Sequence, residues 1–524
     1  MPRIRTHHAG DLSRDDPRAG PLKSFLVHEI QSEDGSFEGI SGPFGQWNRR
    51  LEPTATGINQ IIDYRSQLPH WGWLVDLASR VALPRLLARN QASTWGPSDL
   101  LSHRQASLLC RCATLSLIAG FLGGLISNTL AFLAKDFGET AAAQANALAI
   151  IRIGTLVTMI GTALADRLGR RRMLLGSLYL ASVAALVTAV APSLQVVTIA
   201  QLVGRGSVAV SAFVIPIICV EEMPKRSRSF AIGVLALPAG LGVGMVLWFL
   251  PILDVSQGAW RAMFLVGFAL ILATRYAGKD LTETRRFVVA DHLEPTHHHP
   301  KVHPGRFVAI GMTLLLLNVF AAPTQQLQND YLLEERDFSA SRVALFLLLT
   351  NTWGFIGVLG GSQIADRWSR KWAAGLGIAG LTLGNTLMFN ATGWPMWVAS
   401  TVGSVVGAMS ISSIGALLPE LFPTKRRGLA NGTLQLLAVA GSVAGLYLVR
   451  DRIDTIGYGP TTRLIASFPL LALIPLCFLP ETSGQSLEAL NDEELPELGS
   501  TTVEDEDLGL DEPAIHPIDP TALN

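Results

Sequence analysis

The stretch GTALADRLGRRR, residues 161–172, places four arginines and an aspartate directly after about twenty residues that carry a single charge. Apolar runs of that length can cross a bilayer as a helix, and cations gather at the cytoplasmic ends of such helices because they resist translocation. The stretch therefore predicts a cytoplasmic turn between two membrane spans.

The composition of the whole chain is that of a membrane protein. The 524 residues are 49% hydrophobic and 16% charged, with a mean hydropathy of +0.35. Backbone polar groups in lipid must pair internally, and the apolar runs lack the alternation of barrel strands, so we expect helices. Twelve spans are predicted, near 108–133, 141–165, 172–191, 194–220, 229–252, 260–277, 307–328, 341–365, 372–391, 395–419, 428–449 and 463–479.

The distribution of lysine and arginine between loops predicts the orientation. With the N-terminus in the cytoplasm, the inner loops carry nineteen cations and the outer loops seven. We therefore expect a multi-pass protein of the cell membrane with both termini in the cytoplasm.

The sequence outside the spans divides into three parts. Residues 1–107 are expected to form a cytoplasmic extension of patchy order, in which 68–89 is a helix lying on the inner membrane surface or packed against the bundle. The loop 279–305 separates the spans of 108–278 from those of 306–480. Residues 481–524 form an acidic cytoplasmic tail. The histidines of the loop, at 297–299, lack the spacing of a metal site, and we expect neither a metal nor a cofactor.

Three matches reveal an internal repeat. GTALADRLGRRR resembles GSQIADRWSRKW at 361–372, at an offset of 200. EEMPKRSRSFAIG at 221–233 resembles ELFPTKRRGLANG at 420–432, and LTETRRF at 281–287 resembles LPETSGQ at 479–485. The repeat predicts an all-α membrane protein of two six-helix bundles in parallel orientation, with a solute site between them.

These motifs resemble those of the major facilitator superfamily, in the branch of sugar porters and organic-ion transporters. The resemblance covers about 108–490 and is carried by the 161–171 loop, both Glu-x-x-Pro-x-x-x-Arg motifs, ETRRF at 283–287 and PETSGQSLE at 480–488. It implies inner-face ion pairs that hold the outward-open state. Asp166 and Asp366 would pair with guanidinium groups and helix N-termini, and Glu221 and Glu420 would serve Arg228 and Arg427 likewise. Plain topology would explain the cations but not the acids. The gating residues expected are Asp166, Arg167, Arg170, Arg171, Glu221, Arg228, Asp366, Arg367, Arg370, Glu420 and Arg427.

Two arginines, Arg152 and Arg205, fall well inside the spans, and an intramembrane charge points to a functional site. They are either satisfied by carbonyls, amides and water, attract an anionic solute, or reach the outer surface. Leu122 stands where many proton-coupled sugar porters carry an acid in the first helix.

Other polar residues in the spans are candidates for binding or for interhelical hydrogen bonds. Gln325 and Gln326 resemble part of a sugar-binding tripeptide, although the remaining sugar-porter residues are missing. The candidate set is Asn128, Asn318, Gln325, Gln326, Asn351 and Trp353 beside the two arginines, with Asn385 and Gln435 as further polar positions.

The chain is therefore expected to be a secondary transporter of a small polar solute, either an organic anion or a sugar-like metabolite, with an unidentified coupling ion. A receptor that binds solute without flux and a drug or organic-cation exporter are the alternatives. No P-loop, nucleophile elbow, zinc motif or dinucleotide fingerprint occurs, so we expect neither an enzyme nor a nucleic-acid binder.

Overall fold

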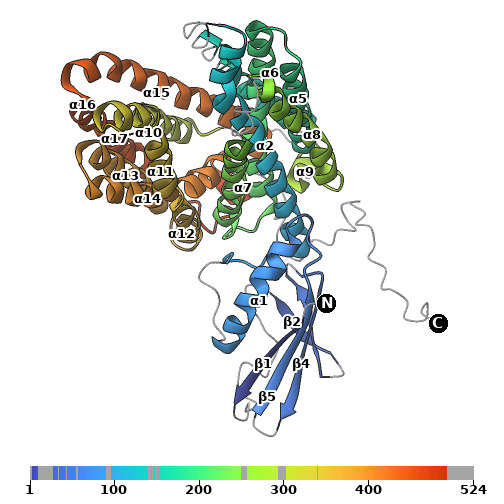
Figure 1. Ribbon diagram of the computed structural model, residues 1–524. Helices are drawn as coiled ribbons and strands as arrows, with labels where there is room; N and C mark the ends of the chain where they lie inside the picture. The colour runs from blue at the N-terminus through green and yellow to red at the C-terminus, as the bar shows by residue number, and fades with distance from the viewer. Residues whose placement is uncertain are drawn as a thin grey trace.

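The computed structural model describes residues 3–9, 27–32, 35–42, 44–54, 57–89, 96–139, 143, 146–147, 150–151, 153–249, 257–292, 302–338 and 340–491. A helical bundle forms the larger part, and a sheet with one helix lies at one end of it (Figure 1). The expected histidines of the central loop, Arg152 and most of the acidic tail lie outside the described residues.

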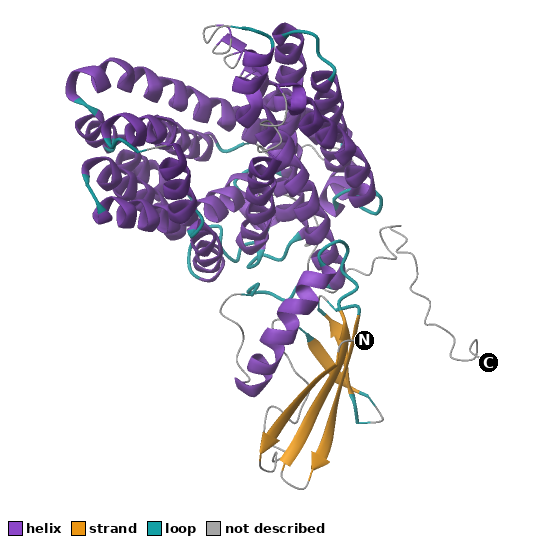
Figure 2. Ribbon diagram, viewed as in Figure 1, coloured by secondary structure: helices purple, strands orange, loops and turns teal. Residues whose placement is uncertain are grey.

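The region before the bundle contains a five-stranded sheet that our sequence interpretation, an extension of patchy order, did not predict (Figure 2). All four strand pairings in the described residues are antiparallel, and the strands lie in the order β1-β5-β4-β3-β2. Their bounds are β1 Arg3–Ala9, β2 His28–Gln31, β3 Phe37–Ser41, β4 Gln46–Thr54 and β5 Gly57–Arg65.

A buried ion pair interrupts the apolar-polar alternation expected of strand β4. Trp47 and Arg49 alternate toward the interior of β4, so a cation occupies a position where an apolar residue is expected. The Arg49 guanidinium donates to both carboxylate oxygens of Glu29, at 3.0 and 2.7 Å, and lies 4.1 Å from the Phe37 ring centre. Trp47 Nε1 donates to the same carboxylate at 2.7 Å.

Helix α1 (Gly72–Arg89) falls within the stretch predicted to be helical, and it packs on the sheet. Leu83 joins the apolar cluster of Val27, Phe44, Trp47, Ile62 and Tyr64. The opposite face carries exposed Trp73, Leu74 and Leu77. We call β1–β5 with α1 the N-terminal sheet domain.

The bundle is built from two sets of helices. The first set is α2 (His103–Asp136), η1 (Gly154–Leu156), α4 (Val157–Leu168), α5 (Arg170–Ala189), α6 (Leu194–Glu222), α7 (Arg228–Phe249), η3 (Gln257–Ala259), α8 (Trp260–Gly278) and α9 (Arg285–His292). The second set is α10 (Pro304–Asp330), η4 (Tyr331–Glu335), α11 (Ala340–Asn351), α12 (Gly354–Arg367), α13 (Arg370–Asn390), α14 (Trp394–Glu420), η5 (Thr424–Arg426), α15 (Arg427–Ile456), α16 (Tyr458–Ile465), α17 (Ser467–Cys477) and α18 (Leu487–Asn491).

Eleven helices among the described residues are long and apolar enough to span a membrane. The second of our twelve expected spans, 141–165, lies partly outside the described residues, and its described part is η1 with the start of α4. The two sets meet where α4 packs on α15 and α7 packs on α12. The predicted helical membrane bundle is thus observed.

The opening motif forms the turn between α4 and α5. Gly169 has φ of +101°, a conformation that side chains rarely adopt, and an added Cβ would lie 2.4 Å from Glu283 Oε2. The glycine lets α5 begin at Arg170, directly after the last residues of α4.

Replacing Glu29 by Ala should destabilise the N-terminal sheet domain by about 3–5 kcal/mol, because it leaves the Arg49 charge buried without its carboxylate. Hydrogen exchange of the amides of β3, β4 and β5 in the full chain measures this. Glu52→Ala, an exposed acid on β4, is the matched control. Equal protection in both variants would contradict a structural role for the buried pair.

Candidate transport site and inner gate

The conserved spacing of the repeat brings charged residues together where the two halves meet. In the first cluster, Arg170 Nη2 lies 3.2 Å from Asp166 Oδ1 and 3.4 Å from Glu221 Oε1. Arg427, from the second half, donates to Glu221 Oε1 at 2.6 Å. The backbone N–H groups of Gly428 and Leu429 donate to the two Asp166 oxygens at 3.1 and 3.0 Å.

The second cluster repeats this arrangement with the halves exchanged. Arg370 pairs with Asp366 at 3.4 Å and also with Glu420. Arg228, from the first half, donates to Glu420 Oε1 at 3.0 Å. The Asp366 oxygens accept from the backbone N–H groups of Ser229 and Phe230, at 3.0 and 2.7 Å.

Each acid therefore has a partner in the opposite half in addition to the arginine of its own half. Glu221 pairs with Arg427, and Glu420 pairs with Arg228. The arginine of each Glu-x-x-Pro-x-x-x-Arg motif therefore pairs with the glutamate of the other motif, across the interface, and not with the glutamate of its own. Each aspartate caps the first turn of a helix in the other half, where free N–H groups and the helix dipole favour a negative charge.

Burial makes these pairs mutually dependent. The side chains of Arg170, Arg228, Arg370 and Arg427 are each at most 1% exposed. A buried charge is costly unless it is paired and hydrogen-bonded. Two further contacts tie the halves: Arg170 Nη2 donates to the Thr424 carbonyl at 2.7 Å, and Arg370 Nη2 to that of Lys225 at 3.0 Å.

The third repeated motif, at 281–287 and 479–485, holds the backbone at the cluster arginines. Glu283 accepts from the backbone N–H of Arg170 at 2.8 Å, and Glu481 accepts from that of Arg370 at 3.0 Å. Burial opposes the charge of Glu481, but hydrogen bonds from the Ser369 hydroxyl and from neighbouring backbone N–H groups outweigh it and lower the pKa of this carboxyl.

Three expected gating residues lie at the edge of the clusters. Arg167 and Arg367 have exposed side chains, and Arg367 Nε donates to Ser98 Oγ at 3.4 Å. The Arg171 guanidinium donates to the Gly278 carbonyl at 3.4 Å, and the backbone N–H of Arg171 donates to Glu283 Oε1 at 3.1 Å.

Glycines allow the helices of the two halves to approach closely beside the first cluster. A Cβ on Gly428 would lie 2.1 Å from the Thr162 carbonyl oxygen, and one on Gly432 would lie 2.4 Å from Thr162 Oγ1 and 2.8 Å from Met159 Cα. The Gly-x-x-x-Gly spacing places both on one face of α15.

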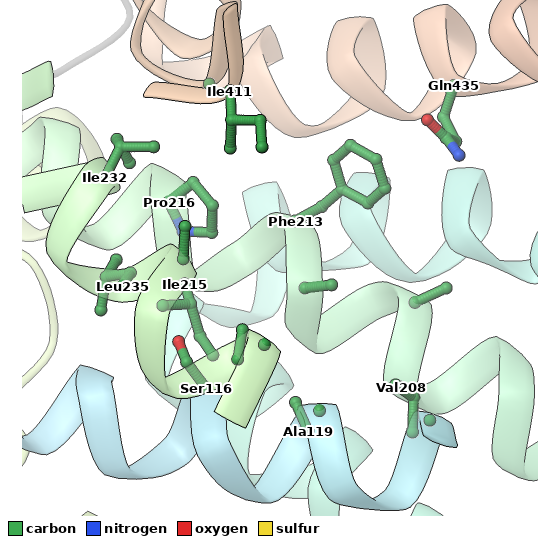
Figure 3. A pocket seen from close by; sticks show the side chains of 18 of the residues that line it. Ser116, Ala119, Val208, Phe213, Ile215, Pro216, Ile232, Leu235, Ile411 and Gln435 are labelled. Carbon is green, nitrogen blue, oxygen red and sulfur yellow. The ribbon is translucent and has the colours of Figure 1, made fainter. Parts of the chain in front are cut away.

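A cavity of about 690 Å³ lies between the halves, lined by α2, α6 and α7 of the first half and by α14 and α15 of the second. Figure 3 shows Phe213 and Pro216 of α6 on one side, with Ile411 and Gln435 of the second half opposite them. Most lining residues are apolar, and the polar lining side chains are Ser116, Arg205, Asn431 and Gln435. Asn431 is 3% exposed, and its Oδ1 accepts no hydrogen bond within the described residues.

Of the predicted binding set, Arg205 lines this cavity, as does Gln435 from the further polar positions, and Arg152 lies outside the described residues. Arg205 Nη1 donates to the Gly123 carbonyl at 3.2 Å and to Ser127 Oγ at 3.5 Å. Asn128 and Asn318 donate to carbonyls of their own helices. The remaining candidates, Gln325, Gln326, Asn351 and Trp353, are exposed and do not line the cavity.

Two helical halves related by a repeat, with a cavity between them, are an architecture of membrane transporters. A family model described as "Sugar (and other) transporter" matches residues 109–295, and one described as "Major Facilitator Superfamily" matches residues 304–504. The chain belongs to the major facilitator superfamily, as a multi-pass membrane transport protein and not an enzyme.

Individual relatives agree at low identity. The glucose transporter GlcP of Staphylococcus epidermidis is 21% identical over 74% of this chain and 96% of its own length. The galactose-proton symporter of Escherichia coli K12 is 24% identical over 71% and 92%.

Solved structures share the fold. The proton:xylose symporter XylE from E. coli has a TM-score of 0.59 at 18% identity, covering 74% of this chain and 99% of its own. The human organic anion transporter MFSD10 has a TM-score of 0.57 at 15% identity, covering 71% and 98%.

Replacing Gly432 by Ala should weaken the contact between α4 and α15, because the new methyl group would collide with the Met159 backbone. We then expect the ends of α4 and α15 beside the ion pairs to separate more readily, and the ratio of molecules open at that end to molecules closed there to rise about tenfold, as for 1.4 kcal/mol of packing strain. Distances between spin labels on the inner ends of α4 and α15 measure the ratio. Gly244→Ala, where a Cβ meets nothing within 4 Å, is the control. An unchanged ratio for Gly432→Ala would contradict the tight contact.

Proposed function

We propose that the chain carries a small organic solute across the membrane by alternating access, with the crossed ion pairs as its inner gate. The two clusters close the side of the cavity on which the Arg228 and Arg427 helices begin. Opening this side requires that the inter-half pairs break, and water entering from the cytoplasm can then solvate the separated charges. The crossing of the pairs is the observation that carries this role.

The preferred substrate we propose is an organic anion with an apolar body. The cavity wall consists mainly of aliphatic and aromatic side chains, which suit an apolar body better than a ring of hydroxyl groups. Arg205 is the charged side chain among the described lining residues, and its charge favours an anion on this wall. Asn431 and Gln435 supply amide groups opposite it.

A sugar-like metabolite is the second candidate. The family model of the first half and the names of the glucose and galactose transporters favour it. The relative named as a proton symporter also makes a proton the first coupling ion to test.

The clustered cations at the ion pairs support a cytoplasmic position for that end of the bundle, and the N-terminal sheet domain lies at the same end (Figure 1). We infer that both termini are cytoplasmic and that the protein resides in the cell membrane, as the name of the inner membrane transport protein YhjE of E. coli indicates for that relative.

The exposed face of α1 is proposed to lie in the headgroup region of the inner leaflet. Trp73, Leu74 and Leu77 are 66%, 42% and 54% exposed. The His70 ring, just before α1, contacts the ring of Tyr276, which is 69% exposed on α8. The apolar face of α1 therefore begins beside the exposed side of α8, which would face lipid. Exposed cations of α8 and α1 suit anionic headgroups: Arg80, Arg275 and Lys279.

Replacing Arg205 by Ala should weaken binding of an amphipathic carboxylate such as 3-phenylpropionate about tenfold or more, because a charge-assisted hydrogen bond contributes about 1.5–3 kcal/mol. Thermal-shift titration of purified protein against the carboxylate, glucose and a quaternary ammonium ion measures this, with flux in proteoliposomes as the second readout. Arg463→Ala, an exposed cation on the outer side, is the control. Stabilisation by glucose but not by the carboxylate would contradict an organic anion as the preferred substrate and favour a sugar.

A spin label at Leu77→Cys, with Cys110, Cys112, Cys219 and Cys477 replaced, should be more accessible to oxygen than to a water-soluble nickel chelate in anionic-lipid nanodiscs. A label at Arg50→Cys, exposed on β4, should show the opposite preference. Equal accessibility profiles at the two sites would place the α1 face in water.

A further inference from the structure

The segment just before α2, residues 96–99, lies across the boundary between the two halves. On the first half, the backbone N–H of Asp99 donates to Ser227 Oγ at 2.9 Å, and the Ser227 hydroxyl donates back to the Asp99 carbonyl at 3.1 Å. The Asp99 carboxylate accepts from the backbone N–H of Arg226 at 3.0 Å. These bonds hold the segment on the loop between α6 and α7.

The same short segment also reaches the second half. Gln363 Nε2 of α12 donates to the Gly96 carbonyl at 2.8 Å, and Arg367 Nε donates to Ser98 Oγ at 3.4 Å. Gln363 is 9% exposed, so its amide is largely removed from water by this contact. Four consecutive residues therefore bond both halves beside the Asp366 cluster.

The residues that receive the segment differ between the two repeats. Ser227, which is buried, corresponds to Arg426, whose side chain is exposed. Gln363 corresponds to Ala163 at the matching position of α4. The gate residues themselves are alike in both repeats, so the two copies diverge where the segment is bound.

The segment is fixed to the first half more firmly than to the second. Ser102 caps α2 in a capping box with Gln105, and the Gln105 amide donates to the Glu222 carbonyl at 3.0 Å. Leu101 is buried in the core of the first half. When the halves separate, the segment must stay with α2 and release α12.

We propose that residues 96–99 are a latch on the inner gate, held by the first half and engaging Gln363 and Arg367 only while the inner side is closed. The proposal rests on the gate proposed above and adds to it a contact that the repeat does not contain. Its bonds are lost on opening, so they favour the outward-facing state.

The latch also connects the gate to the N-terminal sheet domain. Helix α1 ends at Arg89, and Gly96 is seven residues further on, a span of at most about 25 Å at 3.3–3.6 Å per residue. The start of α1 is tied to α2, because Trp71 Nε1 donates to Thr114 Oγ1 at 3.0 Å. The domain is thus attached to the bundle on both sides of α1, which makes it a place where a binding event could bias transport.

The test compares Gln363→Ala and Asp99→Ala in the full chain. Each should raise the ratio of inner-open to inner-closed molecules about 3- to 10-fold, as expected for the loss of one or two hydrogen bonds. Distances between spin labels at the inner ends of α7 and α12 measure the ratio. Because both residues act through one segment, the double variant should shift the ratio by less than the product of the two single effects.

Arg426→Ala, which alters the matching position of the other repeat, should leave the ratio unchanged. Gln363→Ala installs the residue that α4 carries at its equivalent position, and thermal unfolding monitors its stability. Asp166→Asn reports on the gate itself. A shift with Asp166→Asn but none with Gln363→Ala or Asp99→Ala would overturn the latch alone. No shift with any of them would overturn gate and latch together, and multiplicative effects in the double variant would refute action through one segment.

Discussion

The structure depends on the requirement that charges buried at the inner ends of the helices find partners. Four arginines and the glutamates between them are almost completely shielded, and each glutamate is paired with an arginine from the other half. Docking of the halves completes both clusters at once. The net energy of such pairs is modest, because desolvation offsets most of the attraction. In the proposed gate, separation of the halves toward water would return that solvation, as reversible opening requires.

The repeat made the residues of the ion-pair clusters predictable, but not which of them pair with one another. Matching acids and arginines at offsets near 200 identify the helix ends that carry charge, and Glu283 with Glu481 extends the match to the supporting layer. Spacing along one chain cannot tell whether Glu221 meets Arg228 or Arg427, since both lie at the inner surface. The pairing across the two halves follows from the packing of α15 on α4. Glycines permit this packing, and a glycine carries no charge that would mark the contact in the sequence.

Polar residues inside spans were only a partial guide to the cavity, since Arg205 and Gln435 line it and most of the others do not. Asn128 and Asn318 satisfy their amides on carbonyls one turn back in the same helix, which any helix in lipid offers. The cavity wall is instead set by apolar residues and prolines that are typical of spans in general. The sequence pattern did not predict the sheet either. Arg49 occupies an interior strand position, and its pairing with Glu29, which explains that position, is visible only in the structure.

The cavity and the gate use the same stretches of helix. Pro216 lies five residues before Glu221 on α6, and Pro419 directly precedes Glu420 on α14. Asn431 and Gln435 follow Arg427 by one and two turns of α15, within about 12 Å at helical rise. A solute that contacts both α6 and α15 therefore touches the two helices that the Glu221–Arg427 pair joins. Any change in the spacing of those helices on binding is transmitted to that pair, because packed helices move as rigid units over such short distances.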